Sequence, residues 1–188
     1  SEAKETNSIN TIYFADGKLI GHNTDIAGFE LSIRHCKYNA NKKKALIIGA
    51  GGVVPSIIVA LKKMNIEKIF VKNRSENNAL NLKKKFPEIN LIDWNKTIDV
   101  DMIINATSIG LKKGEKLDID LKKFGENKFF YDVIYNPKET NFLSDARKLG
   151  NLAENGKMMF IYQAHQAFSV WHKIFPVIDD EVIGIVEK

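Results

Sequence analysis

A glycine-rich segment, Gly49-Ala50-Gly51-Gly52-Val53, has the residue types and spacing of a phosphate-binding turn. It follows the apolar run 45–48 and precedes an apolar stretch that continues to about Met64. Glycines let the backbone bend sharply and approach a pyrophosphate, and a helix that begins there offers free N–H groups to the phosphates. Val54 stands where the fingerprint has its third glycine, so a purely structural turn is the alternative. We predict that Gly49, Ala50, Gly51, Gly52 and Val53 bind a dinucleotide.

The residues after the next apolar run indicate which dinucleotide is bound. An NAD site places a carboxylate about 20 residues past the glycines, where it accepts a hydrogen bond from the ribose 2′-hydroxyl. This chain has Asn73-Arg74-Ser75 there instead, with Lys72 as a second candidate cation. A guanidinium can pair with a 2′-phosphate through two parallel hydrogen bonds, whereas a carboxylate would repel it. We therefore predict NADP as the cofactor, the alternative being a basic surface loop.

Four further polar residues could act on a substrate, and each also has an ordinary structural explanation. Asp25 lies at an expected helix start, where Thr24 or Asp25 can cap the helix. Gln163 lies in an apolar segment, where an inward-facing amide without partners costs about 1–3 kcal/mol. Tyr135 can be a packed core tyrosine, and Asn10 can be a turn residue. The residues alone leave these alternatives open.

The elements that must position these residues follow from the hydrophobic pattern. The runs 11–14 and 18–20 flank Asp16-Gly17 and predict a β-hairpin, followed by a helix. From residue 42 onward strands alternate with helices; strands are expected at 45–48, 68–71, 90–92, 102–104 and 129–133, and helices at 52–64, 76–85, 141–149 and 156–174. This alternation predicts an α/β fold, a Rossmann-like doubly wound parallel sheet with helices on both faces.

Composition narrows the range of functions. The 188 residues carry a net charge of +5, and the lysine clusters 42–44 and 83–85 flank expected elements, which favours a solvated surface over a nucleic-acid interface. Cys36 is the single cysteine, so no internal disulfide forms, and we expect a cytoplasmic protein. The uncharged stretch 45–61 is too short to span a bilayer. His165 and His172 lie seven residues apart, so we expect no metal site.

Six segments, in order, resemble the motifs of the shikimate dehydrogenase family. They are Gly21-His22-Asn23-Thr24-Asp25, Gly49-Ala50-Gly51-Gly52, Asn73-Arg74-Ser75, Asn105-Ala106-Thr107-Ser108-Ile109-Gly110, Tyr131-Asp132-Val133-Ile134-Tyr135-Asn136-Pro137, and Gly156-Lys157-Met158-Met159 with Gln163-Ala164. The resemblance implies an oxidoreductase of aromatic amino acid and chorismate biosynthesis that reversibly reduces 3-dehydroshikimate to shikimate with NADPH.

The resemblance also implies roles for individual residues. Asp25 would be the acidic member of a catalytic Lys–Asp pair. Substrate would be bound by Asn10, Thr24, Tyr135 and Gln163. Besides the glycine turn, the cofactor would be bound by Asn73, Arg74, Ser75, Thr107, Ser108, Val133, Gly156 and Met159.

The same resemblance predicts the domain organisation. Residues 1–41 would be the end of a substrate-binding domain with its linking helix, and residues 42–188 the NADP-binding domain. The family's N-terminal domain carries a Ser-x-Ser pair and the catalytic lysine, and we match neither upstream of Asn10. We therefore expect a fragment that binds NADPH but oxidises shikimate negligibly.

Two other functions are compatible with these residues. One is a quinate/shikimate dehydrogenase that uses NAD, and the other is a non-catalytic dinucleotide-binding module. An oligomer is compatible with the sequence.

Overall fold

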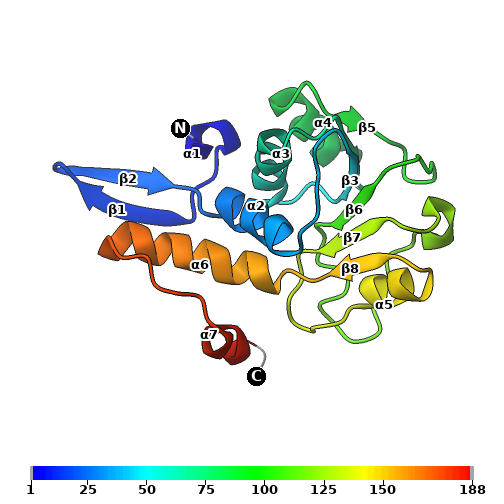
Figure 1. The fold of residues 1–188 in the computed structure, drawn as a ribbon. Helices are drawn as coiled ribbons and strands as arrows, with labels where there is room; N and C mark the ends of the chain where they lie inside the picture. The colour runs from blue at the N-terminus through cyan, green and yellow to red at the C-terminus, as the bar shows by residue number, and fades with distance from the viewer. Residues whose placement is uncertain (1, 187–188) are drawn as a thin grey trace.

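The computed structural model describes residues 2–186, which form a parallel sheet, a hairpin and helices on both sheet faces (Figure 1). The hairpin pairs β1 (Thr11–Ala15) with β2 (Lys18–His22). The six parallel strands lie in the order β5-β4-β3-β6-β7-β8. Their bounds are β3 (Lys44–Ile48), β4 (Lys68–Lys72), β5 (Asn90–Leu91), β6 (Met102–Asn105), β7 (Phe129–Asp132) and β8 (Leu152–Glu154). This order is that of dinucleotide-binding folds, with the switch point between β3 and β6.

Helices cover both faces of this sheet (Figure 1). Their bounds are α1 (Glu2–Thr6), α2 (Asp25–His35), α3 (Val54–Lys63), α4 (Glu76–Lys85), the 3₁₀ turn η1 (Leu121–Phe124), α5 (Asn141–Lys148), α6 (Lys157–His172) and α7 (Asp180–Ile185). Of these, α7 lies apart from the sheet and has no buried residue (Figure 1). Side chains of β3 alternate between two cores: Ile47 packs with α2 and α3, whereas Leu46 and Ile48 pack with α5 and η1. The predicted doubly wound sheet is therefore confirmed.

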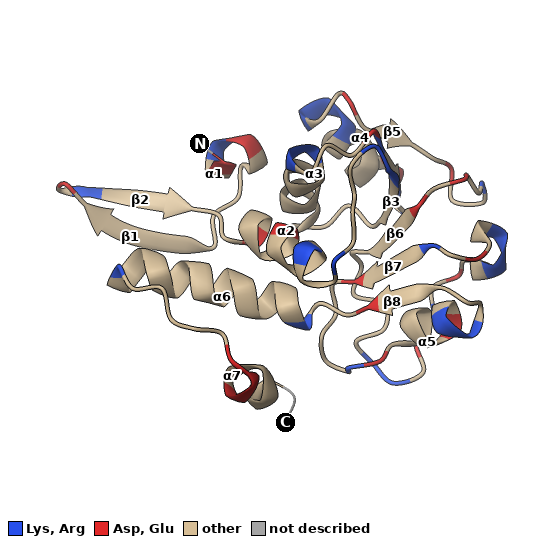
Figure 2. Ribbon diagram, in the orientation of Figure 1, with Lys and Arg blue, Asp and Glu red and all other residues tan. Residues whose placement is uncertain are grey.

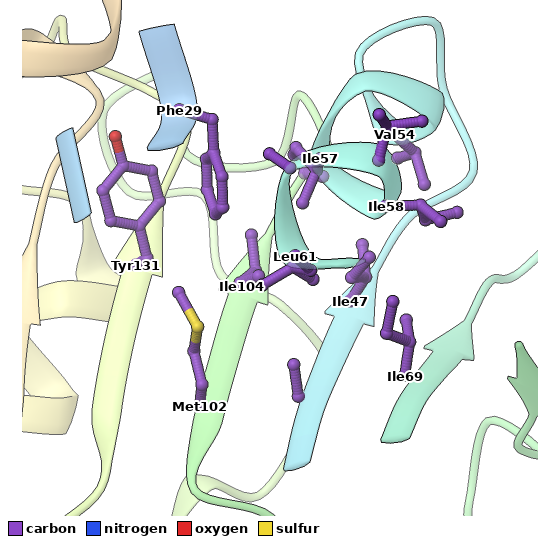
Figure 3. Packing of buried hydrophobic residues seen from close by; sticks show 14 of the residues in the cluster. Phe29, Ile47, Val54, Ile57, Ile58, Leu61, Ile69, Met102, Ile104 and Tyr131 are labelled. Atoms are coloured by element: carbon purple, nitrogen blue, oxygen red, sulfur yellow. The ribbon is translucent and has the colours of Figure 1, made fainter. Parts of the chain in front are cut away.

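The larger core fixes α2 and α3 against the centre of the sheet. Ile57 and Leu61 of α3 lie over Ile47 and Ile104, and Phe29 of α2 lies beside Tyr131 (Figure 3). The rings of Phe29 and Tyr131 meet edge to face, 5.2 Å apart. Each such buried aliphatic side chain contributes about 1.5–3 kcal/mol of burial free energy. This packing, with the hydrogen bond from Asn23 Nδ2 to Ser56 Oγ, holds the start of α2 against α3, the helix that follows the glycine turn.

Most predicted elements are present, and the differences have local causes. The hairpin and the helix 76–85 match the prediction, and Pro55 lies in the first turn of α3 as expected. We did not predict α1, β8 or α7, which are short. The predicted side-chain cap of α2 is wrong: Thr24 is the N-cap residue but makes no capping bond, and Asn23 Oδ1 accepts from Ile26 N at 3.3 Å instead.

Charged residues are common around the sheet and sparse on α6 and the hairpin. Lys, Arg, Asp and Glu are interspersed around the sheet domain, while α6 and most of the hairpin carry few charges (Figure 2). Trp171 of α6 donates from Nε1 to the Ile12 carbonyl at 2.9 Å and joins this helix to the hairpin. Among residues 2–186 no helix has the length and apolar character to cross a membrane. The domain boundary at residue 41 stays a prediction.

Candidate functional site

Two loops meet at the carboxyl edge of the sheet, after the neighbouring parallel strands β3 and β4. Gly49 N, directly after β3, donates to the Lys72 carbonyl at the end of β4 at 2.8 Å. Arg74 follows two residues later, is exposed, and makes no hydrogen bond or ion pair within residues 2–186. The glycine turn and Arg74 therefore border the same edge, as an adenosine 2′-phosphate site requires.

The backbone of the glycine turn is open to a ligand. Gly51 and Gly52 are exposed, and their N–H groups donate to no atom of residues 2–186. They lie just before α3, whose N-terminus adds a partial positive charge. Gly49 has a φ of +118°, and a Cβ there would lie 2.8 Å from the Ala106 carbonyl oxygen. A side chain at residue 49 would separate β3 from β6 at the switch point.

The loop after β4 is ordered around Asn73, whose Nδ2 donates to the Ser75 carbonyl at 2.7 Å. Lys72, the second candidate cation, does not reach this loop surface. Its side chain is 2% exposed and donates from Nζ to the Lys96 carbonyl, and burial lowers the pKa of its ammonium group. The expectation that Lys72 assists Arg74 is wrong, and Arg74 is the cation of this loop that faces solvent.

A cavity of about 510 Å³ lies beyond the glycine turn, between the loops that follow β6 and β7. Its lining residues are Val53, Ala106, Thr107, Ser108, Leu111, Val133, Ile134, Tyr135 and Asn136. Gly156, at the start of α6, packs so closely that a Cβ there would lie 2.1 Å from the Val133 carbonyl oxygen. Met159, in the first turn of α6, is buried. Four predicted cofactor residues, Val53, Thr107, Ser108 and Val133, thus wall one cavity.

Three of the predicted substrate residues form a polar cluster with Asp25. Asn10 Nδ2 donates to Asp25 Oδ1 at 2.9 Å, and Asn10 Oδ1 accepts from Thr24 N at 2.9 Å. Thr24 Oγ1 lies 3.1 Å from Asn10 Oδ1 and 3.4 Å from Gln163 Oε1. Burial raises the pKa of the Asp25 carboxyl, and the bond from Asn10 offsets part of that rise. The cluster joins residues from the hairpin, α2 and α6.

Tyr135, the fourth predicted substrate residue, stands apart from this cluster at the wall of the cavity. Its ring stacks on Phe160 with centroids 4.6 Å apart. Phe160 and Gln163 are three residues apart on α6 and therefore neighbours on its surface. One helix thus connects the cavity to the polar cluster.

Sequence reasoning missed a buried residue that holds this arrangement together. Asn23 is fully buried, and its Nδ2 lies 3.0 Å from Ser56 Oγ of α3 and 3.1 Å from the Ser8 carbonyl. It therefore ties the start of α2 to the helix behind the glycine turn. The sequence feature that could have identified it is its position in the segment 21–25, directly before the assigned residues Thr24 and Asp25.

Metal-ligand side chains do not gather in the part of the chain that the structure describes. No group of three or more His, Cys, Asp or Glu residues among 2–186 is arranged to hold an ion.

Comparison with known proteins gives one consistent family. The family model described as shikimate/quinate 5-dehydrogenase matches residues 30–137. A protein of Pelagibacter ubique named shikimate dehydrogenase (NADP(+)) is 59% identical over 186 residues, which cover 99% of this chain and 70% of that protein. The chain thus spans about two thirds of that relative's length.

Solved structures agree with this family. Shikimate 5-dehydrogenase of Thermus thermophilus, in complex with NADP(H) and shikimate, superposes with a TM-score of 0.87 at 28% identity, covering 98% of this chain and 69% of that one. Shikimate dehydrogenase of Aquifex aeolicus gives a TM-score of 0.85 at 30% identity, covering 99% and 68%. By these matches in sequence and in fold, the chain belongs to the shikimate/quinate 5-dehydrogenase family.

Proposed function

We propose that this chain binds NADP(H) and takes part in the reversible reduction of 3-dehydroshikimate to shikimate. The observation that carries the proposal is the free guanidinium of Arg74 beside the exposed glycine turn. The names of the relatives support it, since the Pelagibacter protein is named for NADP(+) and the Thermus structure contains NADP(H) and shikimate.

Different residues at the carboxyl edge of the sheet bind different parts of the cofactor in this proposal. The N–H groups of Gly51 and Gly52 hold the pyrophosphate, aided by the dipole of α3. Arg74 pairs with the 2′-phosphate, and Asn73 and Ser75 fix the loop that carries it. Thr107, Ser108 and Val133 enclose the nicotinamide in the cavity that they line. Bound NADPH supplies the hydride.

The polar cluster acts on the substrate side. Asn10, Thr24 and Gln163 bind substrate hydroxyls, and Tyr135 contacts the substrate from the cavity wall. Asp25 is the acidic member of the proton-transferring pair, and Asn10 holds its carboxylate in one orientation. Burial raises the pKa of Asp25, which brings this carboxyl closer to the range in which general acids work.

Equilibrium titration with NADPH and NADH, followed by nicotinamide fluorescence, tests the cofactor. We expect clear binding of NADPH and binding of NADH weaker by about tenfold or more, because a charge-assisted bidentate pair is lost. Equal affinities, or tighter NADH binding, would favour the NAD-dependent alternative.

Reduction of NADP⁺ that depends on shikimate tests the reaction. Turnover with shikimate is expected from a form of the protein that combines this chain with the catalytic lysine, and Asp25→Ala should abolish that turnover. The 188-residue chain alone should show negligible turnover. Cofactor binding without any turnover, in every form of the protein that contains this chain, would favour a non-catalytic binding module.

A further inference from the structure

We infer that the buried pair Asn105 and Asp132 positions the nicotinamide end of the cofactor by fixing the two loops that wall its cavity. The inference rests on the proposed function, because it assumes that the cavity receives nicotinamide. It concerns two side chains that lie behind the cavity wall and are themselves fully buried. They are positioning residues, since they act through the loops.

The two residues occupy equivalent places in the sheet. Asn105 ends β6 and Asp132 ends β7, and they are direct partners in the parallel register. Asn105 Nδ2 donates to Asp132 Oδ1 at 3.0 Å. The loop 106–111 leaves the sheet directly after one of them, and the loop 133–136 directly after the other. The pair therefore joins the two loops that wall the cavity at the points where they leave the sheet.

The side-chain amide of Asn105 holds the first wall, the loop 106–111, through several hydrogen bonds. Its Oδ1 accepts from Thr107 N at 3.1 Å and from Thr107 Oγ1 at 2.8 Å. Its Nδ2 donates to the Ile109 carbonyl at 3.2 Å in addition to Asp132. Thr107 Oγ1 in turn accepts from Ile109 N at 3.1 Å. The conformation of Thr107, which lines the cavity, thus depends on this one side chain.

The carboxylate of Asp132 holds the second wall, the loop 133–136, in the same way. Its Oδ1 also accepts from Ile134 N at 3.1 Å, and its Oδ2 accepts from Thr140 Oγ1 at 2.6 Å. These partners are neutral, and no Lys or Arg pairs with Asp132 within residues 2–186. A buried carboxylate without a cation is costly, so its presence where both walls begin favours a positioning role over simple core filling.

The dinucleotide offers a way to separate this role from a general structural one. Adenosine 2′,5′-bisphosphate carries the 2′-phosphate and the first phosphate of NADPH but no nicotinamide, so it reaches Arg74 and the glycine turn only. Loosening the walls at Thr107 and Val133 should weaken NADPH and spare the bisphosphate. Unfolding or a general distortion would weaken both ligands together.

The experiment measures the Kd of both ligands for the unaltered 188-residue chain and for Asp132→Ala, with thermal unfolding in parallel. We expect the Kd of NADPH to rise about tenfold, because the donors of Asn105 and Ile134 lose their acceptor, while the Kd of the bisphosphate changes by less than about twofold. Asp132→Asn keeps the shape and one acceptor oxygen, and we expect a selective rise of about threefold.

Asn151→Ala is the matched control. Asn151 is also a buried amide that joins two loops, accepting from Lys128 N at 2.8 Å and donating to the Gly125 carbonyl at 3.1 Å, but it precedes β8 at the opposite edge of the sheet. This variant should lower Tm and leave both affinities unchanged.

The outcomes distinguish failure of the positioning role of Asn105 and Asp132 from failure of the proposed NADPH binding. Unaltered NADPH affinity in Asp132→Ala, or equal losses for both ligands, would overturn the inference. If the alanine variant does not fold, an Asp132→Asn variant with unchanged NADPH affinity overturns it equally. Failure of the unaltered chain to bind NADPH would instead refute the proposed function.

Discussion

Asn10 and Asp25 are joined by a hydrogen bond of 2.9 Å from the amide of one to the carboxylate of the other, across fifteen residues of chain. The bond connects the start of the hairpin to the start of α2. Asn10 at the same time accepts from the backbone N–H of Thr24. Its amide therefore holds the carboxylate that we propose acts on the substrate, and it lowers the pKa of that carboxyl against the larger, opposite effect of burial.

Replacing Asn10 by Ala should raise the pKa of Asp25 further. Burial already raises this pKa, and the bond from Asn10 is the cause that opposes it. Folding raises the pKa of this carboxyl, so its contribution to the free energy of unfolding is full below its unfolded pKa, near 4. That contribution is lost as the pH rises through the folded pKa. NMR titration of the Asp25 carboxyl carbon in both proteins checks the shift; an unchanged pKa in the variant would contradict the assignment.

Replacing Arg74 by Ala should weaken NADPH by about tenfold and leave NADH almost unchanged, because only the 2′-phosphate loses its partner. Lys84→Ala is the control, since it removes one positive charge from an exposed position in the last turn of α4. Fluorescence titration of each variant with both cofactors gives the result. A similar loss for NADH, or the same loss in Lys84→Ala, would show that Arg74 does not recognise the phosphate.

Replacing Gly156 by Ala should destabilise the fold by about 3 kcal/mol and impair NADPH binding, because a methyl group would overlap the Val133 backbone. The Cβ would lie 2.1 Å from the carbonyl oxygen, and backbone at that distance must move. Urea denaturation measures the free energy of unfolding. Gly184→Ala, with nothing within 4 Å of the added carbon, serves as the tolerated helix substitution; equal stability of both variants would be inconsistent with this packing.

Cys36 should react slowly with alkylating reagents in the folded protein. Burial, with a smaller effect of Glu154, raises the pKa of its thiol to about 11. Only the thiolate is nucleophilic, so we expect alkylation near neutral pH about a hundredfold slower than in the urea-unfolded chain. Mass spectrometry after timed exposure to iodoacetamide follows the reaction. Comparable rates in folded and unfolded protein would disprove the raised pKa.

The sequence alone determined five of the six strands of the parallel sheet and the position of the glycine turn. The apolar runs at 45–48 and 102–104 are buried on both faces, and such strands are visible without tertiary information. The turn at Gly49–Gly52 was predictable because its glycines follow one of these runs and precede a helix. By contrast, β8 escaped prediction because Ala153 is its only buried residue and Leu152 is 68% exposed.

Only the tertiary structure decided which polar side chains meet. Asn23 reaches Ser56 across 33 residues and Asn105 reaches Asp132 across 27, and no local pattern encodes a contact between separate elements. The burial of Lys72 was equally hidden, since a lysine at a strand end is normally solvated. Local spacing fixes the period of a helix or strand, whereas partners and burial depend on how the elements pack together.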